Sequence, residues 1–197
     1  MRVRISGFNV LLVAGATALA SVSVACGEFI RQDRSPVTLV IDRIEAASGE
    51  TSNFAGTLQS DVETNGGIIS DSARVTMRVI MKDVGTAPTP VNSVTVLRYR
   101  VTYRRADGRS TPGVDVPFPF DSATTFTVIP GSIVSQSFEL VRHSAKLETP
   151  LAALAQSIGL VYSTIADVTF FGRDQAGNEL SVTGSIGVQF GNFADPE

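Results

Sequence analysis

Hydrophobic and polar residues alternate one by one along much of the chain. From 180 to 190 nearly every second position is apolar, with serine, threonine and glutamine among the residues between. This period of two is typical of a half-buried antiparallel strand, because successive side chains of a strand point to opposite faces. A second strand is predicted over 168–173, and the polar link 174–178 predicts a hairpin between the two. Gly184 interrupts the apolar row and predicts a bulge or a bend.

The same alternation recurs upstream and predicts further short strands. They are expected at 37–41, 75–82, 97–104, 126–129 and 134–140. In the third of these, one face is predicted to consist of Leu97, Tyr99, Val101 and Tyr103. Residues 58–62 and 68–69 flank a glycine-containing turn at 64–67, which predicts an additional hairpin.

One short helix is predicted near the C-terminal hairpin, over residues 151–158. Thr149 is its expected N-cap, Pro150 suits its first position, and Gly159 suits its end. With about seven to nine short strands, the chain is expected to form an all-β fold, a single antiparallel β-sandwich. The layout over 36–193 resembles immunoglobulin- and fibronectin-like sandwiches, although it lacks their inter-sheet cysteine pair and core tryptophan. The resemblance implies an architecture and no function.

The N-terminal segment differs from the rest and is predicted to be a secretory signal. Arg2 and Arg4 precede an uncharged stretch from 5 to 27, whose apolar centre spans 10–20. An uncleaved membrane anchor is the alternative, since the stretch is long enough to span a bilayer. The small, mildly polar residues 21–25 favour cleavage.

Two cleavage sites are open. Cleavage after Ala20 would release a soluble protein that begins at Ser21. The segment Ser23-Val24-Ala25-Cys26-Gly27 instead resembles a bacterial lipobox, with Ser23 where leucine is usual. That resemblance implies a lipidated Cys26 at the mature N-terminus, and it is favoured because Cys26 is the only cysteine in the chain.

The lipobox interpretation divides the chain into three parts. Residues 1–25 are the expected signal peptide, 26–35 the lipidated cysteine and a tether, and 36–197 the sandwich domain. The tether would reach about 30 Å when fully extended. Because Gly27 rather than aspartate follows Cys26, the resemblance implies an outer-membrane location facing the periplasm or the exterior, provided the host has such a membrane.

Composition excludes several classes of site. The chain has 197 residues, which suits one domain, and one cysteine and one histidine, which exclude an internal disulfide and a Cys- or His-rich metal site. No cofactor or metal is predicted. The net charge of −3 becomes −5 without Arg2 and Arg4, so nucleic acid is not an expected partner. The lack of tryptophan counts against a sugar-binding platform.

No catalytic residue is predicted. His143 is interpreted as a surface or strand-end histidine, because no nucleophile elbow accompanies it. A hydrolase that uses two carboxylates remains the enzymatic alternative. The scattered candidates are Asp61, Asp71, Asp83, Asp107, Asp115, Asp121, Asp167 and Asp174.

Two groups of residues are candidates for a partner surface. The first is the basic stripe of Arg98, Arg100 and Arg104, for which pairing with acids on a neighbouring strand is favoured over contact with a partner. The second is Phe118 and Phe120, which are expected to point the same way, with burial in the core favoured over exposure.

These observations predict a lipoprotein of the bacterial cell envelope that acts as a binding or structural module. Its membrane contact would be the N-terminal lipid, and its partner another envelope protein or a polymer. The alternatives are an envelope hydrolase and a soluble secreted sandwich domain.

Overall fold

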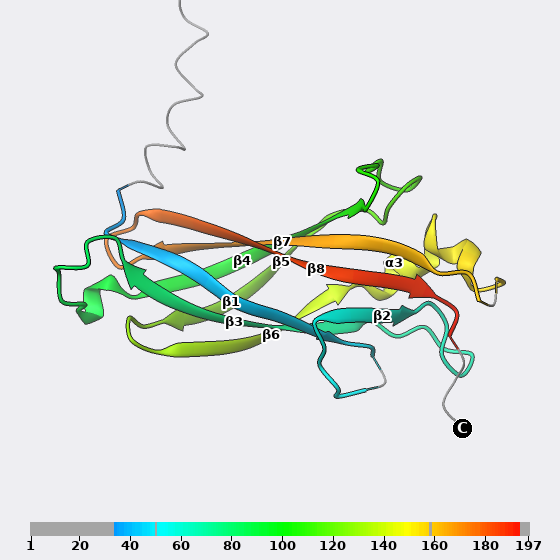
Figure 1. The fold of residues 1–197 in the computed structure, drawn as a ribbon, viewed down its shortest axis with the longest axis horizontal. Helices are drawn as coiled ribbons and strands as arrows, with labels where there is room; N and C mark the ends of the chain where they lie inside the picture. Colours follow the sequence, from blue (N-terminus) through cyan, green and yellow to red (C-terminus); the bar gives the residue numbers. More distant parts are fainter. Residues whose placement is uncertain (1–33, 50, 158, 194–197) are drawn as a thin grey trace, which may run out of the picture.

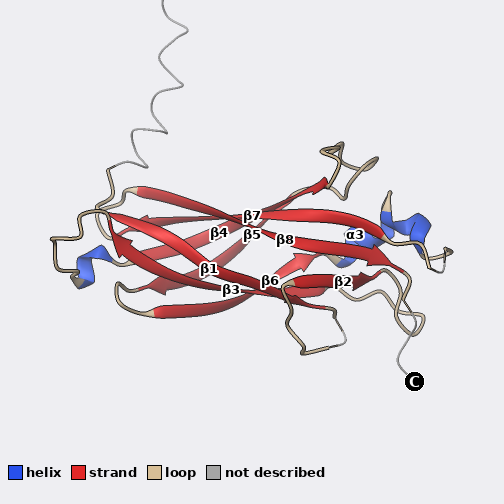
Figure 2. Ribbon diagram, in the orientation of Figure 1, coloured by secondary structure: helices blue, strands red, loops and turns tan. Residues whose placement is uncertain are grey.

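Strands dominate the structure and form two sheets (Figures 1 and 2). The computed structural model describes residues 34–49, 51–157 and 159–193. Within these residues the strands are β1 (Val37–Ala47), β2 (Thr57–Asp61), β3 (Asp71–Met81), β4 (Val94–Arg105), β5 (Phe120–Val128), β6 (Ile133–Val141), β7 (Tyr162–Asp174) and β8 (Glu179–Gly191). The expected all-β class and the C-terminal hairpin of β7 and β8 are confirmed.

One sheet has the strand order β1-β3-β6 and the other β2-β8-β7-β4-β5. All pairs are antiparallel except β2 and β8, which run parallel, so the prediction of a wholly antiparallel fold is wrong at this strand. No hairpin joins β2 to β8, and the chain between them is long enough for either direction. The additional hairpin predicted around 64–67 is also wrong, because the turn forms but residues 68–70 are not a strand.

The core lies between the sheets and is centred on aromatic rings. The ring centroid of Phe138 lies 5.1 Å from that of Tyr99 and 5.3 Å from that of Phe170, in edge-to-face arrangements. Each such pair contributes about 0.5–1.5 kcal/mol beyond the area it buries. These three rings come from β4, β6 and β7 and so join the two sheets.

A bulge in β4 changes one predicted face. The pairing of β4 with both neighbours shifts between Val96 and Arg98. Val96 is therefore fully buried, whereas Leu97 is 45% exposed and leaves the inward row predicted for it. An extra residue in one strand exchanges the inward and outward positions on one side of the bulge. The local sequence does not indicate this exchange.

Gly184 has a different role from the predicted bulge. The pairing of β7 with β8 continues through it without a shift. A Cβ atom at this position would lie 2.8 Å from Cδ1 of Ile44 and 3.0 Å from Cδ1 of Ile41. The glycine therefore permits the close approach of β1 to β8.

The helical segments are short and lie partly outside the predicted range. They are η1 (Pro90–Asn92), α3 (His143–Leu147) and η2 (Leu151–Leu154). The expected helix over 151–158 is wrong: a 3-10 turn forms there, in which Leu151 and Leu154 are the buried residues. A spacing of three suits the 3-10 helix, whose side chains at i and i+3 align. Thr149 does not cap it, because its Oγ1 donates a hydrogen bond to the carbonyl of Gly113 at 2.8 Å.

The loops gather at two opposite ends of the sandwich (Figure 1). Residues 34–36 and the loops 82–93, 129–132 and 175–178 form what we call the tether end. The strand residues next to them pair within each sheet: Val37 with Met81, and Val94 with both Val128 and Asp174. The backbone amide of Lys82 donates to the carbonyl of Pro36 at 2.9 Å, which fixes the entry of the chain there. The opposite, far end holds the described parts of the loops 48–56, 62–70, 106–119 and 142–161.

Candidate functional site

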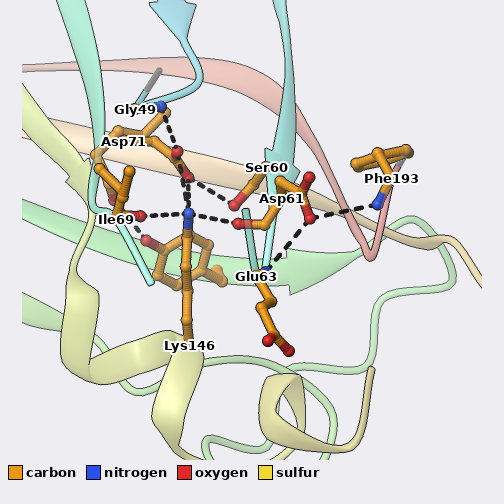
Figure 3. A network of polar contacts seen from close by, with 10 residues as sticks. Gly49, Ser60, Asp61, Glu63, Ile69, Asp71, Lys146 and Phe193 are labelled. Atoms are coloured by element: carbon orange, nitrogen blue, oxygen red, sulfur yellow. Dashed lines mark hydrogen bonds and ion pairs between the residues drawn. The ribbon is translucent and has the colours of Figure 1, made fainter. Parts of the chain in front are cut away.

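The charged side chain of Lys146 lies in the interior of the far end, only 2% exposed (Figure 3). Its Nζ donates to the backbone carbonyls of Asp61 at 2.7 Å and Ile69 at 2.5 Å, and lies 3.0 Å from Oδ2 of Asp71. A lysine ammonium has three donors, and these three partners match that number. The helix α3 therefore places a fully bonded cation between β2 and β3.

Asp71, the first residue of β3, is the buried partner of this cation. Its Oδ2 accepts from the hydroxyl of Ser60 at 2.6 Å, and its Oδ1 accepts from the backbone amide of Gly49 at 3.0 Å. Burial raises the pKa of Asp71 above its usual 3.8, although Lys146 and the hydrogen bonds act in the opposite direction. The pair thus ties together β2, β3, α3 and the loop that follows β1.

Asp61 links this network to the surface. Its carbonyl is held by Lys146, while its carboxylate Oδ1 accepts from the backbone amides of Glu63 and Phe193, each at 3.3 Å (Figure 3). Asp61 is 8% exposed. Both its backbone and its side chain are therefore fixed where the fold meets solvent.

A groove of about 450 Å³ opens beside Asp61. Thr57, Gln59 and Asp61 alternate along β2 and so share one face, and Gln189 of β8 pairs with Gln59 across the sheet. The loop after β1 supplies further hydroxyl and amide groups, among them those of Thr51 and Asn53. The volume falls in the range of small-molecule sites, about 300–1,000 Å³.

Among the described residues, the groove lining contains one carboxylate and no lysine or arginine. Asp71 lies behind it, without solvent contact. Among the described residues, no group of three or more His, Cys, Asp and Glu side chains is arranged to hold a metal ion. The geometry therefore suits hydrogen bonding to a polar ligand.

Each arginine of the predicted basic stripe pairs with an acid of a neighbouring strand. Arg98 and Arg100 both contact Asp121, at 3.2 and 2.8 Å, and Arg104 contacts Asp167 at 2.8 Å. The expectation of cross-strand pairing is confirmed. The use of the stripe by a partner stays a prediction, and all of these side chains lie outside the groove.

The two phenylalanines have different environments, so the expectation of burial in the core is confirmed for Phe120 and wrong for Phe118. Phe120 is buried, and its ring centroid lies 6.2 Å from that of Tyr99. Phe118 precedes β5 and is 45% exposed, with its ring against Gly113. A Cβ atom at Gly113 would lie 2.6 Å from Cζ of Phe118, so the missing side chain makes room for the ring.

His143 begins α3 and is exposed, as expected for a strand-end histidine. Most of the candidate carboxylates lie apart in turns or in ion pairs. Lys146 contacts the carboxylate of Asp71 and only the backbone carbonyl of Asp61. Cys26 and the predicted signal peptide lie outside the described residues. Of the helices in the described residues, none has the length and apolar character of a membrane span.

The sequence did not point to Lys146, Gln59 or Gln189 as site residues. A signal for Asp71 was present: it is in phase with Ala73, Val75 and Met77, the inward row of β3. No such signal marks Lys146, whose helix was not predicted.

Comparisons with known proteins add no assignment. No protein-family model matches the chain, and no curated protein matches it.

Proposed function

We propose that the chain is a bacterial envelope lipoprotein, anchored through Cys26, whose sandwich acts as a binding module and presents the groove away from the membrane. The observation that supports this proposal is the position of the two ends. Arg34 follows Cys26 by eight positions and enters at the tether end, whereas the groove lies at the far end. Strands such as β1, with 11 residues, separate the ends by roughly 35 Å.

The lipid attachment suits this geometry. A lipobox product carries several acyl chains, and two or more chains anchor a protein stably where one does not. The short tether then leaves the sandwich close to the bilayer, and the contacts of Ser35 and Pro36 with the tether end direct that end toward it. The host membrane is an outer membrane where the cell has one.

We further propose that the sandwich is immunoglobulin-like. In constant-type immunoglobulin domains, strands A, B and E share one sheet, and C, F and G share the other. The order β1-β3-β6 corresponds to A-B-E, and β4, β7 and β8 correspond to C, F and G. This correspondence supports the architecture, and β2 and β5 extend the second sheet at its edges.

The enzymatic alternative is an envelope hydrolase. It would need two carboxylates that reach one substrate, at about 5–9.5 Å from each other. Of the described carboxylates the groove offers Asp61, because Asp71 is enclosed by its own partners. This arrangement favours a binding role. The arginine stripe and the exposed Phe118 are secondary candidates for contact with an envelope protein or polymer.

Membrane fractionation of a bacterial host tests the anchor. The unaltered chain and the Ser23→Leu variant, which restores the usual lipobox residue, are expected in the membrane fraction. The Cys26→Ser variant is expected to lose lipidation and leave that fraction. Equal recovery of all three chains as soluble protein would overturn the anchor and favour a secreted domain.

A further inference from the structure

The groove at the far end has a lining that indicates its ligand. We propose that it binds a neutral saccharide, a proposal that rests on the binding role inferred above and names its substrate class. Hydroxyl and amide groups, one carboxylate and one aromatic ring lie around the same 450 Å³ space. This combination matches a polyhydroxylated ring, which offers many donors and acceptors around faces of C–H groups.

Three amide side chains line the groove. Gln59 and Gln189 lie side by side on paired strands, and Asn53 faces the same space from the loop after β1. Each amide both donates and accepts, so a pair of amides can bond adjacent hydroxyls of one sugar ring. Thr51 and Thr57 add hydroxyls and methyl groups to the same lining.

The carboxylate of Asp61 is held in a fixed position beside the groove. Its carboxylate is held by two backbone amides through Oδ1, and its carbonyl is held by the buried Lys146. A carboxylate fixed in this way loses little conformational freedom when it accepts hydrogen bonds from a ligand. Charge-assisted hydrogen bonds of this kind are stronger than neutral ones.

Phe193 is the aromatic residue of the groove lining. Its backbone amide donates to Oδ1 of Asp61, so this phenylalanine and the carboxylate are held next to each other. The chain lacks tryptophan, which first counted against a sugar platform. The groove provides a phenylalanine instead, and we expect the lower stacking area to give weak binding, with a dissociation constant in the millimolar range.

The charge of the groove lining favours a neutral ligand over an anionic one. An anionic ligand would meet the negative charge of Asp61, and the lining residues that the structure describes include no lysine or arginine to compensate it. Lys146 does not compensate the charge of such a ligand, since its three donors are directed at Asp61, Ile69 and Asp71. An extended peptide along the edge of β2 is the competing occupant, and it is an outcome of the test.

The test is a nuclear magnetic resonance titration of the full chain in detergent, with maltotriose, N-acetylchitotriose and tetra-alanine as probes. At least one trisaccharide is expected to shift the amide signals of 51–64, 189 and 193 in a saturable way. Gln59→Ala and Asp61→Asn should weaken binding at least fivefold. The matched control Gln175→Ala, at the tether end, should bind as the unaltered chain does.

Two results would overturn the proposal. One is the absence of saturable shifts with either trisaccharide at tens of millimolar, in a chain whose spectrum shows that it is folded. The other is shifts with tetra-alanine alone, which would assign the groove to a peptide. Neither result bears on the lipid anchor, and a peptide result would retain the binding role while changing its ligand.

Discussion

The Nζ atom of Lys146 lies 3.0 Å from Oδ2 of Asp71, with both side chains enclosed by the fold. Neither group meets water, so each depends on the other and on neighbouring polar groups for compensation. Ser60, Gly49 and two carbonyls provide those further bonds. The pair therefore fixes the floor on which the groove is built.

Removal of the cation should be costly. Lys146→Met leaves Asp71 charged and unpaired in the interior, and we expect a loss of about 3–5 kcal/mol in the free energy of unfolding. Urea denaturation measures it. The double variant Lys146→Met/Asp71→Leu should recover part of the loss, because it removes both charges. A loss below about 1 kcal/mol for the single variant would contradict a compensated buried pair.

The carboxyls of Asp71 and Asp107 should titrate on opposite sides of their usual pKa of 3.8. Burial raises the pKa of Asp71, so the folded state keeps that proton to higher pH than the unfolded state. Its contribution to stability therefore falls as the pH rises from 3.8 through the raised pKa.

The pKa of Asp107 shifts in the opposite direction. Hydrogen bonds from the side chain and backbone of Arg109 lower the pKa of Asp107 to about 2. The contribution of Asp107 to folding stability is therefore present above pH 3.8 and is lost as the pH falls through 2. Carbon-13 titration of the two carboxyls measures both midpoints. Coincident midpoints near 3.8 would show that neither environment is as described.

Two strand glycines should differ in their tolerance of alanine. At Gly172 a Cβ atom would lie 2.7 Å from the backbone oxygen of Thr95, which cannot move independently, so Gly172→Ala should cost about 1–3 kcal/mol. At Gly184 the contacts are the Cδ1 atoms of two isoleucines, which can rotate away, so Gly184→Ala should cost less than about 1 kcal/mol. Thermal unfolding of both variants compares them, and the reverse order would refute this reasoning.

Two tyrosine hydroxyls should also differ. The hydroxyl of Tyr103 donates to the carbonyl of the buried Leu140 at 2.5 Å. The hydroxyl of Tyr99, an equally buried residue, donates at 3.0 Å to the carbonyl of the half-buried Glu139. Tyr103→Phe leaves a buried acceptor without its partner and should cost about 1–3 kcal/mol. Tyr99→Phe should cost less, because the acceptor that it leaves behind belongs to the half-buried Glu139. Chemical denaturation would show equal losses if burial did not matter here.

The strands that the sequence predicts well are those with nearly complete alternation. Leu180, Ile186, Val188 and Phe190 are buried on one face of β8 as expected, and the inward row of β3 is equally regular. In such segments the local pattern and the tertiary burial agree, so periodicity is enough to identify both the strand and its inner face.

The remaining features depend on contacts between distant residues. The bulge at Leu97 and the parallel pairing of β2 are set by neighbouring strands, which no local pattern reveals. The groove combines Asn53, Gln59 and Asp61 with Gln189 and Phe193, and its floor depends on Lys146. From the sequence alone, a lysine within a short helix is expected at the surface, because lysine is rarely buried unless it is paired.

Mass spectrometry of the N-terminal peptide, from protein isolated from bacterial membranes, tests the central claim most directly. A chain anchored at the tether end should begin at Cys26 and carry the added mass of a diacylglycerol group and an acyl chain. A chain that begins at Ser21 with an unmodified Cys26 would contradict the account.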